Sequence, residues 1–189
     1  MRRVGLLGLV VLTALALVAT PAEAATRPAT FHLRYFETFG GKQSGDAFLG
    51  VVAHGAIALT VKGGDPVPGL ARGGTFVTRY DIDAQGTYRG LLVVTFAARS
   101  LGTMCLEATI TVGRIKPGAS FPPAVTTFTS VGGTGGSAAL RLAGRANATD
   151  IVGGTDDERI TAKGGLTVTT GAGKAPTRAC LAVARLAKS

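Results

Sequence analysis

Four residues in the middle of the chain could carry acid–base chemistry. Arg79, Tyr80 and Asp81 are consecutive, and Glu107 follows in a later apolar segment. Side chains alternate between the two faces of a strand, so Arg79 and Asp81 share one face and Tyr80 takes the other. A carboxylate inside an apolar barrel would have a raised pKa, and could exchange a proton with a bound substrate. The alternative is that these residues lie outside and form cross-strand pairs.

Two acidic segments have some features of cation sites. Residues 81–86 have the oxygen-ligand spacing of a calcium loop, but Arg89 and Leu92 stand at later ligand positions, which favours a hairpin turn. A second cluster, for which a solvated loop is the favoured interpretation, consists of Asp150, Asp156, Asp157 and Glu158. The sequence therefore predicts no metal site.

No hydrolytic or nucleotide-binding motif accompanies these residues. His32 and His54 supply the imidazole groups of the chain, and no serine stands in a G-x-S-x-G turn. His32 alternates with apolar neighbours on an expected strand, which favours a surface position. Residues 133–138 match part of a dinucleotide fingerprint, but a strand is expected after them where that fingerprint needs a helix. We expect no cofactor, and enzymatic activity is left open.

The chain has two cysteines, Cys105 and Cys180. An even number of cysteines in an exported chain ordinarily forms disulfides. A bridge between them would close a loop of about 75 residues and stabilise the fold by roughly 4 kcal/mol on the chain-entropy model. Two free buried thiols are the alternative.

The first 24 residues have the organisation of an export signal. Two arginines form a basic start, residues 4–20 are almost uninterruptedly apolar, and Ala22, Ala24 and Ala25 surround the expected cleavage after Ala24. A membrane anchor is the alternative, but a spanning helix needs about 20 apolar residues and this run is shorter. We expect a protein secreted to the exterior or the cell envelope, with no membrane anchor after cleavage.

The composition excludes several classes of protein. Of 189 residues, 46% are hydrophobic and 16% are charged, which is too apolar for a disordered chain. The formal net charge is +9, and a basic chain can be attracted to anionic polymers. The cations stand singly and not in runs, which argues against nucleic-acid binding. Contact with anionic cell-envelope polymers therefore stays open.

Alternating apolar segments separated by Gly, Pro and Asp begin at residue 30, and this pattern is typical of strands and turns. The expected strands are residues 30–37, 48–61, 75–82, 88–96, 103–115, 124–131, 138–145, 166–170 and 178–186. Turn-forming residues place loops at residues 40–45 and 147–157, among others. After the signal, residues 25–189 are expected to form a single all-β domain, an antiparallel β-barrel of about eight strands, calycin-like, because closure removes exposed sheet edges.

Residues 74–144 resemble the allene oxide cyclase and dirigent barrel superfamily, in particular its small bacterial members. The matching features are a Thr-Phe-Val strand, a D-x-x-G turn, a cysteine-bearing strand, a Gly-Arg-Ile segment and a G-G-T-G turn, at residues 75–77, 83–86, 105, 113–115 and 132–135. The chain departs from the family in having Ser137 where an aromatic residue is usual, and Gly144 in place of an earlier glycine. The resemblance implies an eight-stranded barrel with an apolar cavity, often as a homo-oligomer. Some members cyclise or orient small hydrophobic substrates.

These observations leave two main hypotheses. In the first, the barrel cavity binds a small hydrophobic molecule, with or without isomerase, cyclase or dirigent-like activity. In the second, the protein is a non-enzymatic envelope or interaction protein whose basic surface meets another molecule. An interior lined by apolar side chains with two or three convergent polar groups would favour the first hypothesis, and a completely filled barrel would favour the second.

Overall fold

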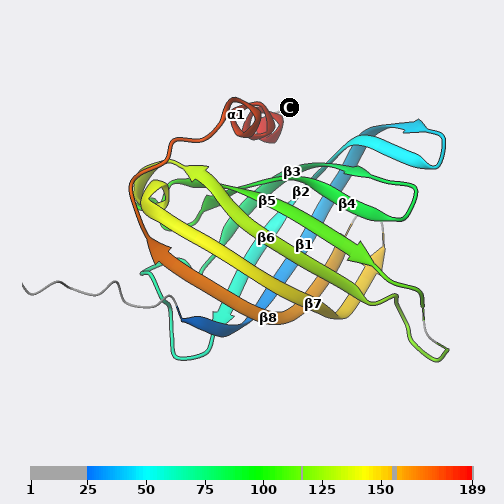
Figure 1. The fold of residues 1–189 in the computed structure, drawn as a ribbon, viewed down its shortest axis with the longest axis horizontal. Coiled ribbons are helices and arrows are strands. Elements are labelled where there is room, and N and C mark those ends of the chain that lie inside the picture. Colours follow the sequence, from blue (N-terminus) through cyan, green and yellow to red (C-terminus); the bar gives the residue numbers. More distant parts are fainter. Residues whose placement is uncertain (1–24, 116, 155–156, 189) are drawn as a thin grey trace, which may run out of the picture.

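Eight antiparallel strands form a closed barrel in which each strand pairs with the next and the last pairs with the first (Figure 1). The computed structural model describes residues 25–115, 117–154 and 157–188. The strands are β1 (Thr26–Ser44), β2 (Ala47–Val61), β3 (Gly74–Ile82), β4 (Thr87–Phe96), β5 (Thr103–Val112), β6 (Ala124–Gly133), β7 (Leu140–Gly154) and β8 (Asp157–Thr170). The predicted all-β barrel is confirmed. The expected signal peptide, with Ala22 and Ala24, lies outside the described residues, whereas Ala25 is exposed just before β1.

One end of the barrel is filled by its own apolar side chains. Leu70, Met104 and Leu166 are each 1% exposed and belong to one continuous core cluster. Leu70 comes from the loop between β2 and β3, and that loop is held by Asp65, whose carboxylate accepts hydrogen bonds from the backbone amides of Gly69 and Ala71 at 2.9 and 3.2 Å. The loop therefore closes this end of the barrel.

Aromatic rings fill the interior at the points where glycines leave room for them. A Cβ atom on Gly55 would lie 2.5 Å from the Phe76 ring, and one on Gly144 would lie 2.3 Å from the Phe128 ring. Phe128 makes an edge contact with Phe31, with ring centroids 5.4 Å apart. Both glycines are thus required by packing, because any side chain would overlap a ring.

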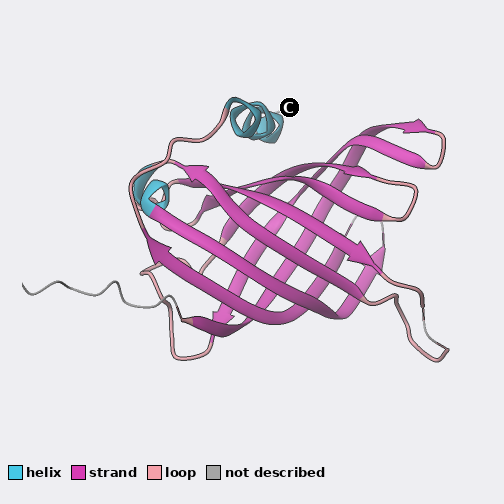
Figure 2. Cartoon of the chain, in the orientation of Figure 1, coloured by secondary structure: helices cyan, strands magenta, loops and turns pink. Residues whose placement is uncertain are grey.

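A C-terminal helix lies outside the barrel wall (Figure 2). This helix, α1 (Arg178–Arg185), continues into the short helix η2 (Leu186–Lys188). Cys180 and Val183 are buried in a cluster that also contains the outward side chains of Val77, Val93 and Cys105. Because residues three apart share one helix face, this amphipathic segment buries one stripe against the sheet. The expected strand over residues 178–186 is wrong.

The Cys105–Cys180 disulfide ties this helix to β5, with Cα atoms 6.0 Å apart. Thr177 caps the helix, since its hydroxyl accepts a hydrogen bond from the backbone amide of Cys180 at 3.2 Å. The bridge and the apolar cluster thus fix the C-terminal segment on the outer face of the barrel. A separate short helix, η1 (Gly135–Ala139), connects β6 to β7.

Two expected loops are largely strands. Residues 147–154 continue β7, and residues 36–44 continue β1 into a hairpin that turns at Gly45. In β7 the polar side chains of Asn147 and Asp150 are exposed, while Ala146 is buried and Ile151 is partly buried. These polar residues therefore mark the solvent face of a strand and not a loop. Among the described residues, no helix has the length and apolar character needed to cross a membrane.

Candidate functional site

The four sequence-predicted site residues divide between the two faces of the barrel wall. Tyr80 has the same parity as the buried Phe76 and Thr78 and faces the interior. Arg79, Asp81 and Glu107 are exposed and have the opposite parity on their strands. The structure therefore does not bring the four residues together, and Tyr80 is the member of the set that faces the interior.

The acidic residues near Tyr80 organise turns and neighbouring strands. Asp81 accepts a hydrogen bond at 2.7 Å from the backbone amide of Gly50 on β2. Asp83 accepts hydrogen bonds from the backbone amides of Gln85 and Thr87 and from the Arg89 guanidinium, at 3.0, 2.8 and 2.9 Å. The Thr87 hydrogen bond is the main reason that the pKa of Asp83 is lowered. This geometry is the hairpin turn expected for residues 81–86.

Three tyrosines gather at the end of the barrel opposite Leu70. The Tyr80 and Tyr88 ring centroids lie 5.5 Å apart, with the rings tilted at 41°. Tyr35 makes an edge contact with Phe76, with centroids 5.2 Å apart. All three tyrosines are partly buried. Aromatic side chains of this kind offer a broad apolar surface together with a polar hydroxyl group.

Glu158 adds a carboxyl group to this cluster. Its Cα atom is the cross-strand partner of the Tyr35 Cα atom, and the side chain is partly buried. Burial raises the pKa of Glu158, and no hydrogen bond or ion pair to this carboxylate is made within the described part of the chain. Desolvation is thus not offset by a described partner. A carboxyl group of this kind keeps its proton to a higher pH than an exposed one, which suits it to exchange a proton with a bound molecule.

The tyrosines and Glu158 influence one another electrostatically. Burial is the largest cause of the raised pKa of Tyr35, and the charges of Tyr80, Glu158 and Tyr88 add to it. The pKa of Tyr80 is raised for the same reasons, by burial first and then by Tyr88 and Glu158. The phenols of Tyr35 and Tyr80 therefore stay protonated and are available as hydrogen-bond donors. We define the site formed by Tyr35, Tyr80, Tyr88 and Glu158 as the tyrosine end of the barrel.

Three residues of the tyrosine end were not among the predicted acid–base residues, although Glu158 was named in the acidic cluster. Tyr35 shares its parity with Phe31 and Leu33, so the first expected strand already contained the signal that it faces inward. Tyr88 pairs with Ile82 across the hairpin, and the hairpin register would have placed it on the same face as Tyr80, diagonal to that residue. Glu158 could not be assigned to the interior because its acidic cluster was interpreted as a solvated loop. Side-chain alternation assigns faces only within strands.

The other members of the predicted acidic cluster separate in space. Asp157 points to the outer wall and forms an ion pair with Arg34 at 2.8 Å, while Glu158 has inward parity. Asp150 is exposed on β7, and Asp156 lies outside the described residues. No group of three or more His, Cys, Asp or Glu that could hold a metal ion occurs in the described ranges.

Two hollows are found on the outer wall. One, of about 240 Å³, lies between the C-terminal helices and the outer faces of β2, β3 and β4, and is bordered by Phe36 and His54. The other, of about 400 Å³, lies on β8, β1 and β2 and is bordered by His32, Arg34, Arg72 and Arg159. The exposed position of His32 agrees with the sequence interpretation. No family model, curated protein or solved structure matches the chain.

Proposed function

We propose that this chain is an exported barrel protein that binds a small, largely apolar molecule at the tyrosine end. The observation that carries the proposal is Glu158, a partly buried carboxyl group opposite Tyr35. Burying a carboxylate without a partner opposes folding, and such groups are concentrated at functional sites. A ligand that hydrogen-bonds to Glu158 would supply the missing partner.

The surroundings of Glu158 suggest the chemistry of the ligand. Tyr80 and Tyr88 offer ring faces, and Ile160, two residues from Glu158 on β8, has the same inward parity. The phenol groups are donors, whereas the Glu158 carboxyl can donate or accept according to its protonation state. The best-fitting ligand is therefore a small hydrophobic molecule that carries a hydroxyl or carbonyl group. The opposite end of the barrel is filled, so binding would involve only the tyrosine end.

Export and family membership are parts of the same proposal. The basic and apolar order of the first 24 residues supports export, and a disulfide between Cys105 and Cys180 agrees with an oxidising compartment. The eight-stranded barrel agrees with the resemblance to the allene oxide cyclase and dirigent superfamily. If the bound molecule is also cyclised or isomerised, Glu158 is the group placed to move the proton.

Native mass spectrometry of the secreted protein tests ligand binding directly. We expect a bound small molecule that is lost on unfolding, and whose mass identifies compounds to test for turnover. Glu158→Gln and Tyr80→Phe should each lower its occupancy by about tenfold, because each removes a hydrogen-bonding group in a partly desolvated site. Glu107→Gln is the matched control, since it removes the same charge from the exposed outer face. Equal occupancy in all variants, or a protein that is always empty, would contradict the proposal.

A further inference from the structure

A hollow on the outer wall, separate from the tyrosine end, combines space with positive charge. It has a volume of about 400 Å³, which is within the range of small-ligand sites. We call it the arginine hollow and define it by His32, Arg34, Ala56, Ala58, Arg72, Arg159 and Thr161. These residues come from β1, β2, β8 and the loop between β2 and β3.

The strand register explains why the wall is hollow at this point. His32 pairs with Ala58, and Arg34 pairs with Ala56, so each long side chain of β1 stands beside a single methyl group of β2. The two small alanine side chains form the floor of the hollow, and the longer side chains around them form its walls. Arg159 on β8 stands at one side of this floor, and Arg72 stands at the other.

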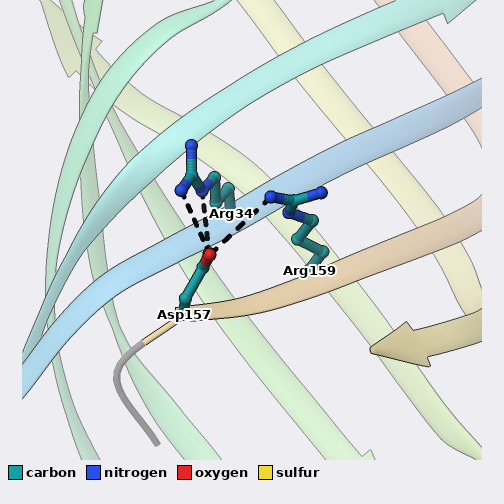
Figure 3. Close-up of polar contacts among 3 residues, drawn as sticks. All are labelled: Arg34, Asp157 and Arg159. Atoms are coloured by element: carbon teal, nitrogen blue, oxygen red, sulfur yellow. Dashed lines mark hydrogen bonds and ion pairs between the residues drawn. The ribbon is translucent and has the colours of Figure 1, made fainter. Parts of the chain in front are cut away.

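The cations of the arginine hollow outnumber the carboxylates near it. Asp157 accepts two hydrogen bonds from Arg34, at 2.8 and 3.1 Å, and lies 3.7 Å from the Arg159 guanidinium (Figure 3). Arg72 has no ion pair with any residue that the structure describes. One carboxylate is therefore shared between two arginines while a third arginine has none, and the hollow has excess positive charge.

Asp157 and Phe36 hold the Arg34 side chain in place, and part of its guanidinium remains available for an oxyanion. Its guanidinium uses two of five N–H groups on Asp157, and its Cζ atom lies 5.1 Å from the centroid of the Phe36 ring, which supports the side chain. Fork-shaped guanidinium groups match the geometry of both carboxylates and phosphates. We propose that the arginine hollow binds an anionic ligand through a phosphate or carboxylate group. This site is independent of ligand binding at the tyrosine end.

Amide chemical shifts measured by NMR can test the proposal on the intact chain. The protein is titrated with sodium phosphate and, separately, with sodium succinate at constant ionic strength. We expect saturable shifts at the amides of Ala56, Ala58 and Thr161 with one or both anions. A response to only phosphate, only succinate or both identifies the chemical group that the ligand carries.

Three variants distinguish a built site from general charge attraction. Arg72→Gln and Arg159→Gln should each weaken binding about tenfold, because each removes a charged hydrogen-bond donor. Ala58→Leu fills the floor without changing the charge and should abolish saturable binding. Arg114→Gln is the control, since it removes one exposed positive charge beyond the end of β5, on the far side of the barrel from β1.

The outcomes separate clearly. Absence of saturation with both anions would overturn the proposal, as would an Arg114→Gln effect as large as that of Arg72→Gln, or full binding by Ala58→Leu. A dispersed amide spectrum establishes that each variant is folded. Glu158→Gln should bind the same anion or anions as the unmodified chain does, so failure at the tyrosine end would not imitate failure at the arginine hollow.

Discussion

Glu158 and Tyr35 are direct cross-strand partners on β8 and β1, and both side chains face the barrel interior. The carboxyl group is partly desolvated, and its charge raises the pKa of the tyrosine. Burial therefore favours the neutral form of Glu158, and an ionised Glu158 favours the neutral form of Tyr35. This relationship makes the tyrosine end sensitive to pH through Glu158.

Glu158→Gln should stabilise the fold at neutral pH. The pKa of Glu158 is raised above its ordinary value of 4.5, so its ionisation opposes folding when the pH exceeds the folded pKa. We expect a gain below about 1 kcal/mol, since the group is partly solvent-screened, or roughly 1–3 °C in Tm. The gain should disappear as the pH falls below 4.5. Thermal unfolding between pH 3 and 8 measures it, and a pH-independent difference, or the same gain in Glu107→Gln, would contradict this explanation.

Removal of the disulfide should destabilise the protein strongly. In Cys105→Ser/Cys180→Ser, the helix α1 loses its covalent link to β5 and is held by the apolar cluster that includes Val77 and Val93. The loop of 75 residues is no longer closed in the unfolded chain, which costs up to roughly 4 kcal/mol of stability. Urea unfolding measures the loss. Loss of the disulfide should also accelerate amide hydrogen exchange more in α1 than in β4. An equal acceleration in both elements would argue against a tethering role.

Asp157→Asn should make stability depend on salt. Arg34 and Arg159 are cross-strand partners, and Asp157 is the carboxylate that lies between them. Without it the two guanidinium groups repel each other, so Tm should fall at low ionic strength and recover when NaCl is added. Asp46→Asn, at an exposed turn, is the matched control.

The same aspartate predicts a pH window. The Arg34 hydrogen bond holds the pKa of Asp157 below its ordinary value of 3.8. Its contribution to stability is therefore present above pH 3.8 and is lost as the pH falls through the lowered folded pKa. The Tm difference between Asp157→Asn and the unmodified protein should vanish at the acid end of a pH series. A difference that persists there would exclude the ion pair as its cause.

Most of the barrel could be predicted because strand alternation is a local property. Met104, Leu106 and Ala108 alternate with Cys105 and Glu107, and the structure directs the two sets to opposite faces as expected. The C-terminal helix was missed because it has only eight residues. Over so short a segment, the helical spacing of the apolar Cys180 and Val183 cannot be distinguished from a strand pattern. Its position depends on the disulfide and on a patch formed by distant strands.

The tyrosine end could be predicted only in part. Parity correctly separated Tyr80 from Arg79 and Asp81, but it does not reveal which face is the interior. That assignment needs the register between β1 and β8, which brings Tyr35 to Glu158 across more than 120 residues of sequence. The arginine hollow has the same origin, since Arg34 and Arg159 are scattered in the sequence and meet only through strand pairing.

The pairing of β1 with β8 also determines the order in which the chain can fold. The hydroxyl groups of Thr26 and Thr167, 141 residues apart in the sequence, lie 2.6 Å apart where the two strands meet. Contacts of such long range form slowly, because a large loop must close before they add any stability. Without β8, strands β1 and β7 would each present an unpaired edge. We therefore expect barrel closure to be a late event, with the interior around Glu158 assembled only when it is complete.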